Sequence, residues 1–232
     1  MMFVLSVIAA AFFAFAEYRG LFIVPPDRMM GDVYRILFVH VPSAWMSMLF
    51  FLLSFVGSAG YLIRRSPAWD RLSYCAAEVG LVMNGLALFL GSVWGKPTWG
   101  VWWTWDPRLT TTALLFVMYS GYLILRRLIN DPDRRAKVAA SVGLLIFLNV
   151  PLVYMSVKWW RSLHQVQSNP NSMDPSMVVS LRLSAFAFLA VCLLLLIFRL
   201  RLAKKEADLE ERLSLPPEGP GAPRAPQSKV TT

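Results

Sequence analysis

The sequence predicts an all-α integral membrane protein, a bundle of six transmembrane helices with both termini in the cytoplasm. The first observation is composition: 56% of the residues are hydrophobic and the mean hydropathy is +0.51. The second is charge, because only 16% of the residues are charged, whereas soluble domains carry about 25%. The third is a series of apolar segments, most of them close to the roughly 20 residues that a helix needs to cross about 30 Å of hydrocarbon.

The chain contains five long apolar segments and a shorter one at its N-terminus. The short segment lacks the basic residues that begin a signal peptide, so we predict a first transmembrane helix, although Ala14-Phe15-Ala16 imitates a cleavage site. Of the other five segments, one contains Glu78, one contains Arg182, and three contain no charged residue. The six predicted spans are residues 1–16, 41–63, 72–94, 109–125, 138–157 and 177–198.

Basic residues indicate which side of the membrane each connecting segment faces. The segments after the second, fourth and sixth spans hold twelve Lys and Arg residues up to Lys205, before the rest of the C-terminal tail is counted, against seven in the alternate segments. Basic segments stay on the cytoplasmic side, so residues 17–39, 94–110 and 158–176 are expected on the outer face. The net charge of +9 then reflects topology, and we infer no nucleic-acid binding. Residues 201–232, which become rich in Pro and Gly after Leu215, are predicted to form a disordered cytoplasmic tail.

Polar residues inside the predicted spans could mark a transport path or join helices to one another. The chain offers few of them, and we expect most to make hydrogen bonds between helices. The residues concerned are Glu78, Asn84, Asn149 and Arg182. Pro151, near the outer end of the fifth span, is expected to kink that helix.

Five of the nine tryptophans are concentrated in residues 94–110. Gly95, Pro97 and Gly100 interrupt this segment, which predicts a loop. Indole rings are common at membrane interfaces, so an interfacial belt is one interpretation. The defined Gly and Pro pattern, followed directly by Asp106 and Arg108, favours a platform for a flat apolar ligand. The five tryptophans are Trp94, Trp99, Trp102, Trp103 and Trp105.

The only two histidines, His40 and His164, both fall on the expected outer face. A single histidine at a helix end usually serves as a polar cap. Two histidines on the same face as an indole-rich loop instead favour a role in binding a ligand. Two imidazoles can ligate haem iron from opposite sides. Indoles suit the porphyrin ring, and cations suit its carboxylates. The cations available on this face are Arg35, Lys96, Arg108 and Arg161.

The segment from Trp94 to Thr110, Trp-Gly-Lys-Pro-Thr-Trp-Gly-Val-Trp-Trp-Thr-Trp-Asp-Pro-Arg-Leu-Thr, resembles the WWD signature of the haem-handling proteins of cytochrome c biogenesis. The setting of the histidines, His40 in His-Val-Pro and His164 in Trp-Trp-Arg-Ser-Leu-His-Gln, fits the same pattern. The chain length and number of spans select the haem exporter protein C (CcmC) family, because the larger WWD proteins carry more spans and further histidines. The resemblance covers residues 32–198.

This resemblance implies that haem b binds at the periplasmic surface of a bacterial inner membrane. His40 and His164 would be the axial ligands of the iron. The cofactor-contacting residues would be Trp94, Trp99, Trp102, Trp103, Trp105, Asp106 and Arg108. Asp106 and Arg108 could contact either the propionates or a docking partner, and the sequence leaves this open.

The resemblance also implies haem handling and delivery rather than enzymatic turnover. The haem would be presented to a membrane-anchored periplasmic haem chaperone (CcmE-like) for covalent attachment, with a small membrane protein (CcmD-like) and an ABC transporter pair (CcmA/CcmB-like) as further partners. Three alternatives remain: a membrane subunit that transports haem or another solute, a b-type electron-transfer cytochrome, and an assembly factor with an interfacial tryptophan belt and no cofactor.

Overall fold

The computed structural model describes residues 2–164 and 173–214, and this part of the chain is helical apart from its connecting segments. Six helical stretches are long and apolar enough to cross a membrane, and each contains all or most of one predicted span. The predicted six-span all-α fold is therefore confirmed, whereas the side on which the termini lie stays a prediction. The elements are α1 (Met2–Tyr18), the π-helix η1 (Arg19–Ile23), the 3-10 helix η2 (Asp32–Ile36), α2 (Leu37–Arg64), α3 (Pro67–Trp99), α4 (Pro107–Leu128), α5 (Pro132–Phe147), α6 (Asn149–Trp159) and α7 (Pro175–Ser214).

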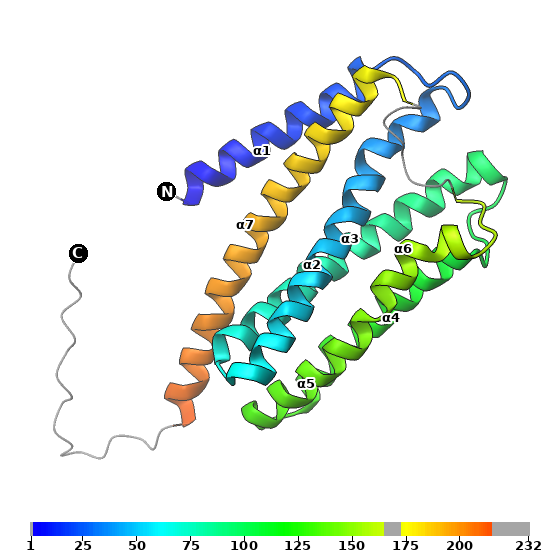
Figure 1. The fold of residues 1–232 in the computed structure, drawn as a ribbon. Coiled ribbons are helices and arrows are strands. Elements are labelled where there is room, and N and C mark those ends of the chain that lie inside the picture. The colour runs from blue at the N-terminus through cyan, green and yellow to red at the C-terminus, as the bar shows by residue number, and fades with distance from the viewer. Residues whose placement is uncertain (1, 165–172, 215–232) are drawn as a thin grey trace, which may run out of the picture.

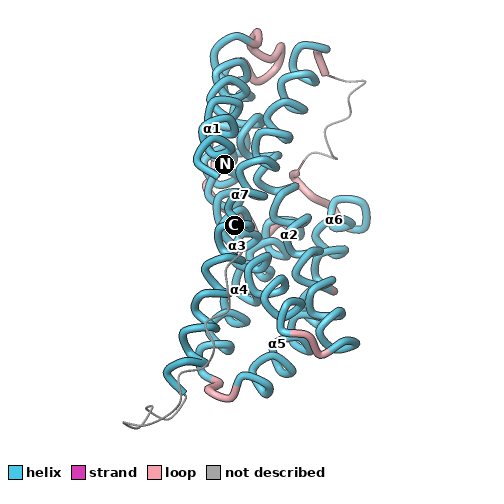
Figure 2. The backbone as a smooth tube through the Cα atoms, turned by 90° about the vertical axis from the view of Figure 1, so that its left-hand side faces the viewer, coloured by secondary structure: helices cyan, strands magenta, loops and turns pink. Residues whose placement is uncertain are grey.

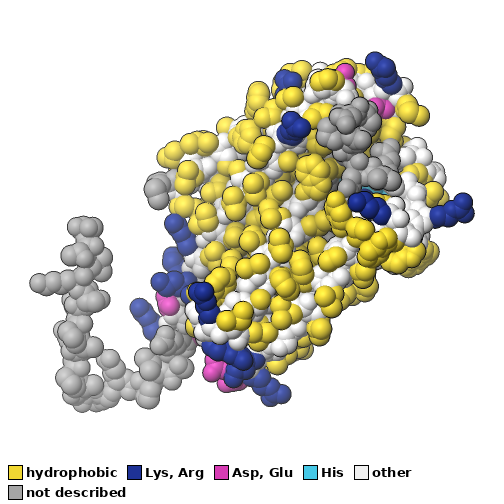
Figure 3. Space-filling model, viewed as in Figure 1, with side chains coloured by type: hydrophobic (Ala, Val, Ile, Leu, Met, Phe, Trp, Pro, Cys, Tyr) yellow, Lys and Arg dark blue, Asp and Glu magenta, His cyan; other side chains and the backbone are white. Residues whose placement is uncertain are grey.

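The antiparallel pair α2 and α3 forms the centre of the bundle (Figure 1). α7 packs against one side of this pair and α1 lies beside α7 at the edge, as the two perpendicular views in Figures 1 and 2 agree. On the other side, α5 packs along α2, and α4 packs against both α3 and α6. The surface between the two ends of the bundle is covered with hydrophobic side chains, and the Lys and Arg side chains lie mainly toward the ends (Figure 3).

Helix boundaries near the outer loops follow from local sequence. Asp106 caps the N-terminus of α4, where its carboxylate accepts a hydrogen bond from the Arg108 backbone N–H, and Pro107 occupies the first helical position, which tolerates a missing N–H. α3 ends at Trp99 and is capped by Gly100, whose positive φ of 80° suits glycine and whose N–H donates to the Lys96 carbonyl. The tryptophan-rich segment is thus only partly a loop: contrary to expectation, residues 94–99 form the last turns of α3 despite Pro97.

The fifth span is interrupted in the middle of the bundle. α5 ends at Phe147 and α6 begins at Asn149, with a tight turn in which the Leu148 N–H donates to the Leu145 carbonyl. Pro151 explains the break, since it offers no N–H to the carbonyl of Phe147 and its ring clashes with that carbonyl in a regular helix. The predicted kink is present, one turn before the proline itself.

Polar side chains within the spans join neighbouring helices, as predicted for Asn149 and Glu78. Asn149 donates from Nδ2 to the Thr111 carbonyl of α4 at 2.8 Å, and Glu78 of α3 pairs with Arg199 of α7 at 2.6 Å. A second ion pair, between Asp70 of α3 and the buried Arg126 of α4, is bidentate, with both N···O distances 2.7 Å. The two ion pairs tie α3, α4 and α7 together toward the end of the bundle opposite the tryptophan-rich segment, whereas the Asn149 bond joins α6 to α4 near the start of α4.

The last helix is longer than expected. Residues 201–214 continue α7, so the prediction of a disordered tail beginning at residue 201 is wrong for this stretch, and residues 215–232 lie outside the described part of the chain. The sequence Lys204-Lys-Glu-Ala-Asp208 consists largely of strong helix formers, and Arg199 pairs with Glu206 two turns away, at 3.4 Å. These local interactions extend the helix beyond its apolar segment.

Candidate functional site

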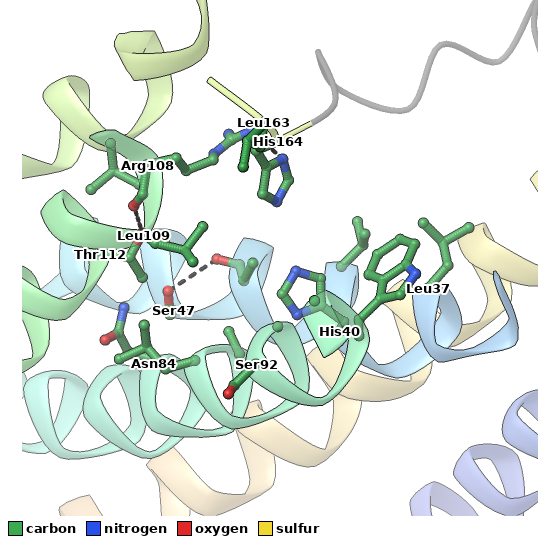
Figure 4. Close-up of a pocket in the computed structure, with 18 of the residues that line it drawn as sticks. Leu37, His40, Ser47, Asn84, Ser92, Arg108, Leu109, Thr112, Leu163 and His164 are labelled. Atoms are coloured by element: carbon green, nitrogen blue, oxygen red, sulfur yellow. Dashed lines mark hydrogen bonds between the residues drawn. The ribbon is translucent and has the colours of Figure 1, made fainter. Parts of the chain in front are cut away.

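A cavity of about 510 Å³ opens between α2, α3, α4, α6 and the segment after α6 (Figure 4). Its volume falls within the roughly 300–1,000 Å³ typical of small-molecule and cofactor sites. Both histidines contribute to its wall, together with Trp94, Trp99 and Arg108. The remaining wall is mostly apolar, so the cavity suits a largely apolar ligand with a few polar contacts.

His40 projects into this cavity from α2, where it lies within the first turns of the helix. Its side chain is buried, with 9% of the residue exposed, and its Nδ1 has no hydrogen-bond partner among residues 2–164 and 173–214. The Trp94 ring stands edge-on to the imidazole at 5.6 Å between ring centroids. Gly91 of α3 allows this position, because a Cβ atom there would lie 3.1 Å from His40 Cε1.

His164 reaches the same cavity from the non-helical segment that follows α6, and Asp106 holds this segment in place. The Asp106 carboxylate accepts hydrogen bonds from the Ser162 hydroxyl at 3.0 Å and the Leu163 backbone N–H at 2.7 Å. The His164 N–H in turn donates to the Ser162 hydroxyl at 3.0 Å. One buried carboxylate therefore caps α4 and positions the segment that carries His164.

The two imidazoles face one another across the cavity, with ring centroids 6.3 Å apart and ring planes inclined by 35° (Figure 4). Two histidines that ligate one metal from opposite sides, with metal–nitrogen bonds of about 2 Å, have ring centroids on the order of 6 Å apart. The observed separation fits an iron atom between the rings. The donor set, two imidazoles with indoles around them, also fits haem.

Arg108 is the cation that lines the cavity. Its Nη1 lies 3.4 Å from His164 Nδ1, and its side chain stands beside His164 in Figure 4. Of the other three cations proposed from the sequence, Lys96 donates to the Gly100 carbonyl at 3.0 Å, and Arg35 pairs with Asp32 at 2.8 Å. Arg161 is exposed and is absent from the cavity wall.

The tryptophans divide into two groups. Trp94, Trp99 and Trp103 line the cavity, and the Trp99 ring lies 6.3 Å from the His164 ring. Trp102 and Trp105 do not line it and are 55% and 84% exposed. Of the five indoles expected to form a platform, three therefore lie in the cavity wall and two lie outside it.

Sequence reasoning did not identify Gly91 or Ser162 as site residues. Gly91 lies within an apolar span, where a glycine carries no signal of its own, and Ser162 is one serine in a polar loop. Asp106 was expected to touch the ligand or a partner. The structure instead places it behind the cavity, 6% exposed, with its oxygens bonded to Ser162, Leu163 and Arg108 of the same chain.

Comparison with known proteins identifies the family to which the chain belongs. The sequence model of the family described as "Heme exporter protein C" matches residues 1–213. The chain belongs to the Heme exporter protein C family. Among members of the family, the Heme exporter protein C of Bradyrhizobium diazoefficiens is 40% identical over 168 residues, which cover 71% of this chain and 64% of that protein.

Two more distant relatives extend the comparison. A ccmC-like mitochondrial protein of cytochrome c biosynthesis from Marchantia polymorpha is 37% identical over 67% of this chain and 65% of its own length. The Heme exporter protein C of Escherichia coli K12 is 35% identical over 76% of this chain and 73% of its own. The matches thus span slightly less than two thirds of the Bradyrhizobium and Marchantia proteins.

Proposed function

We propose that this chain binds haem b as cargo in the cavity, at the periplasmic surface of a bacterial inner membrane, and presents it for cytochrome c maturation. The observation that carries the proposal is the pairing of the only two histidines, from segments 124 residues apart, across one cavity. Membership in the Heme exporter protein C family supports the same ligand. The iron would supply two axial coordination positions, which His40 and His164 would fill.

The residues around the histidines would then orient the porphyrin. Trp94, Trp99 and Trp103 offer apolar faces to the ring. Arg108, the cation in the cavity wall, would pair with a propionate by a charge-assisted hydrogen bond. Asp106 would act indirectly, by fixing the segment that carries His164.

The exposed tryptophans would serve delivery. Trp102 and Trp105 lie outside the cavity, and Trp159 and Trp160, at the end of α6, are 57% and 49% exposed. We propose that this aromatic surface contacts the membrane-anchored haem chaperone (CcmE-like) to which the haem is transferred. The small membrane protein (CcmD-like) and the ABC transporter pair (CcmA/CcmB-like) would complete the assembly.

The experiment that tests haem ligation is absorption spectroscopy of the protein purified from haem-replete cells. We expect a low-spin bis-histidine spectrum for the wild type, a changed spin state in His40→Ala and in His164→Ala, and loss of bound haem in the double variant. A haem-free wild type, or an unchanged low-spin spectrum in the double variant, would contradict the proposal. Insertion of every variant is checked by its yield in the membrane fraction.

A further inference from the structure

The cavity is not a shallow depression at the outer surface. Along α3 its wall runs from Trp99 to Asn84, which at 1.5 Å per residue is about 22 Å. His40 lies against Gly91, near the middle of this length. A ligand held by His40 therefore has space on both sides of the iron, toward the outer surface and toward the centre of the bundle.

The inner end of the cavity is closed. Asn84, Ser47 and Leu115 line its deepest part, and one helical turn further in each helix places Gly80, Phe51 and Tyr119. The rings of Phe51 and Tyr119 are stacked at 3.8 Å between centroids, and neither residue has measurable exposure. Phe51 also fills the space beside Gly80, where a Cβ atom would lie 2.7 Å from it. This packed layer leaves no passage for a porphyrin from the inner end of the bundle.

Among residues 2–164 and 173–214, the side of the cavity between α2 and α6 is open by comparison. α5 packs closely along α2, but after the break at Leu148 the chain leaves α2, and α6 packs on α4 instead (Figure 1). The cavity wall on this side includes Trp45 of α2 and Tyr154 of α6, and each of them is 44% exposed although each also lines the cavity. The cavity consequently reaches the lateral surface of the bundle between these two helices.

The apolar character of this lateral surface matches the hydrocarbon region of a membrane. Leu148, which precedes α6, and Leu152 of α6 are 66% and 38% exposed, and Met48 and Ala44 of α2 line the cavity. Haem is a flat, largely apolar molecule that dissolves in lipid, so it can pass such an opening without crossing water. The aromatic rings at positions 45 and 154 present apolar faces to a planar ligand on this path.

We propose that haem reaches the cavity sideways from the outer leaflet of the membrane, through a lateral opening between α2 and α6 that is bordered by Trp45 and Tyr154. This inference rests on the proposed function, haem binding by His40 and His164. It excludes passage through the centre of the bundle, where Phe51 and Tyr119 close the path.

Bridging the opening tests the proposal. The full-length double variant Trp45→Cys/Tyr154→Cys is reconstituted without haem in phosphatidylcholine vesicles, and the two thiols are joined by a reducible bifunctional cross-linker. Haem is then added to partition into the bilayer, and its binding is followed by growth of the Soret band. The native Cys75 and Cys192 are fully buried, so wild type treated with the cross-linker is the matched control.

We expect bridged protein to load haem at least tenfold more slowly than the same variant before bridging, and reduction of the cross-linker to restore the rate. The variant loaded first and bridged afterwards is expected to retain its haem, which shows that the bridge leaves the site intact. Unchanged loading after complete bridging would overturn the lateral route. Absence of haem binding in wild type and in the unbridged variant would contradict the proposed function instead, so the two failures are distinguishable.

A second variant gives the same test without thiol chemistry. Ala44→Phe adds a ring on the α2 side of the opening, whereas Leu52→Phe adds a ring on α2 at a 42% exposed position outside the cavity wall. We expect Ala44→Phe alone to slow loading several-fold. Equal rates in both variants would count against the opening.

Discussion

The Asp106 carboxylate accepts a hydrogen bond of 2.7 Å from the backbone N–H of Leu163, across 57 residues of sequence. The same side chain accepts from the N–H of Arg108 and caps α4. The start of a transmembrane helix and the segment that carries His164 therefore depend on one acidic residue. This relationship gives the first prediction.

Asp106→Ala should weaken haem binding about 10–100-fold, the usual cost of removing a group that orients a metal ligand. It should also destabilise the helix start by about 1 kcal/mol. Asp131→Ala is the matched control, since Asp131 caps α5 through the Arg134 N–H at 2.6 Å and has no contact with the cavity. Haem titration of both purified variants separates the effects. Equal haem affinity in the two would show that Asp106 is only a helix cap.

Gly91→Ala should disturb the imidazole of His40, because the added methyl group would lie 3.1 Å from Cε1 and one of the two must shift. We expect a shifted Soret band and faster haem loss, with a larger effect in Gly91→Val. Gly121→Ala is the control, since an added Cβ at Gly121 of α4 meets nothing within 4 Å. A wild-type spectrum and dissociation rate in Gly91→Val would rule out ligation by His40 in its present position.

The two groups of tryptophans should give different defects. Trp99→Ala, which alters the cavity wall beside His164, should increase the rate of haem dissociation several-fold. Trp105→Ala, at a side chain 84% exposed, should leave haem binding unchanged and reduce haem transfer to the chaperone. Haem retention and covalent haem on the chaperone are measured for both. If Trp105→Ala transfers haem normally, its exposed indole serves the membrane interface rather than delivery.

Arg126→Met should lower stability without changing the haem spectrum. Removing one partner of a buried ion pair leaves the carboxylate of Asp70 unpaired, which costs about 3–5 kcal/mol. Arg135→Met is the comparison, because its 3.8 Å pair with the exposed Glu210 should contribute about 0–1 kcal/mol. Thermal unfolding in detergent, followed by circular dichroism, measures both. Similar melting temperatures for the two variants would contradict a structural role for the Asp70–Arg126 pair.

The six spans could be predicted because a membrane helix must satisfy its own backbone hydrogen bonds and present apolar side chains for about 30 Å. Such a helix is therefore recognisable in the sequence as a long apolar segment. The break at Leu148 was partly predictable from Pro151. The extension of α3 to Trp99 was not, because Gly95 and Pro97 resemble loop residues locally. Packing around the cavity and the positive φ of Gly100 decide where that helix ends.

The candidate site was only partly predictable, because its geometry depends on contacts between segments that are distant in the sequence. Two histidines on one face of a membrane are consistent with a pair of metal ligands, but the distance between their rings cannot be derived from the sequence. That distance depends on the crossing of α2 with the segment after α6 and on the hydrogen bonds of Asp106. The roles of Gly91 and Ser162 arise from these same contacts, so they appear only once the chain is folded.

The interruption at Leu148 also divides the bundle mechanically. Below it, α5 is packed along α2. Above it, α6 follows α4, so the fifth span changes partner at about the depth where the cavity ends. The joint at Leu148 lacks a regular helical hydrogen bond, so the chain resists bending less there than within α5 or α6. The Asp70–Arg126 and Glu78–Arg199 pairs lie on the other side of this joint, in the inner half of the bundle. If the chain loads and releases haem as proposed, the outer half would be the part that adapts to the ligand, while the ion pairs of the inner half hold α3, α4 and α7 together.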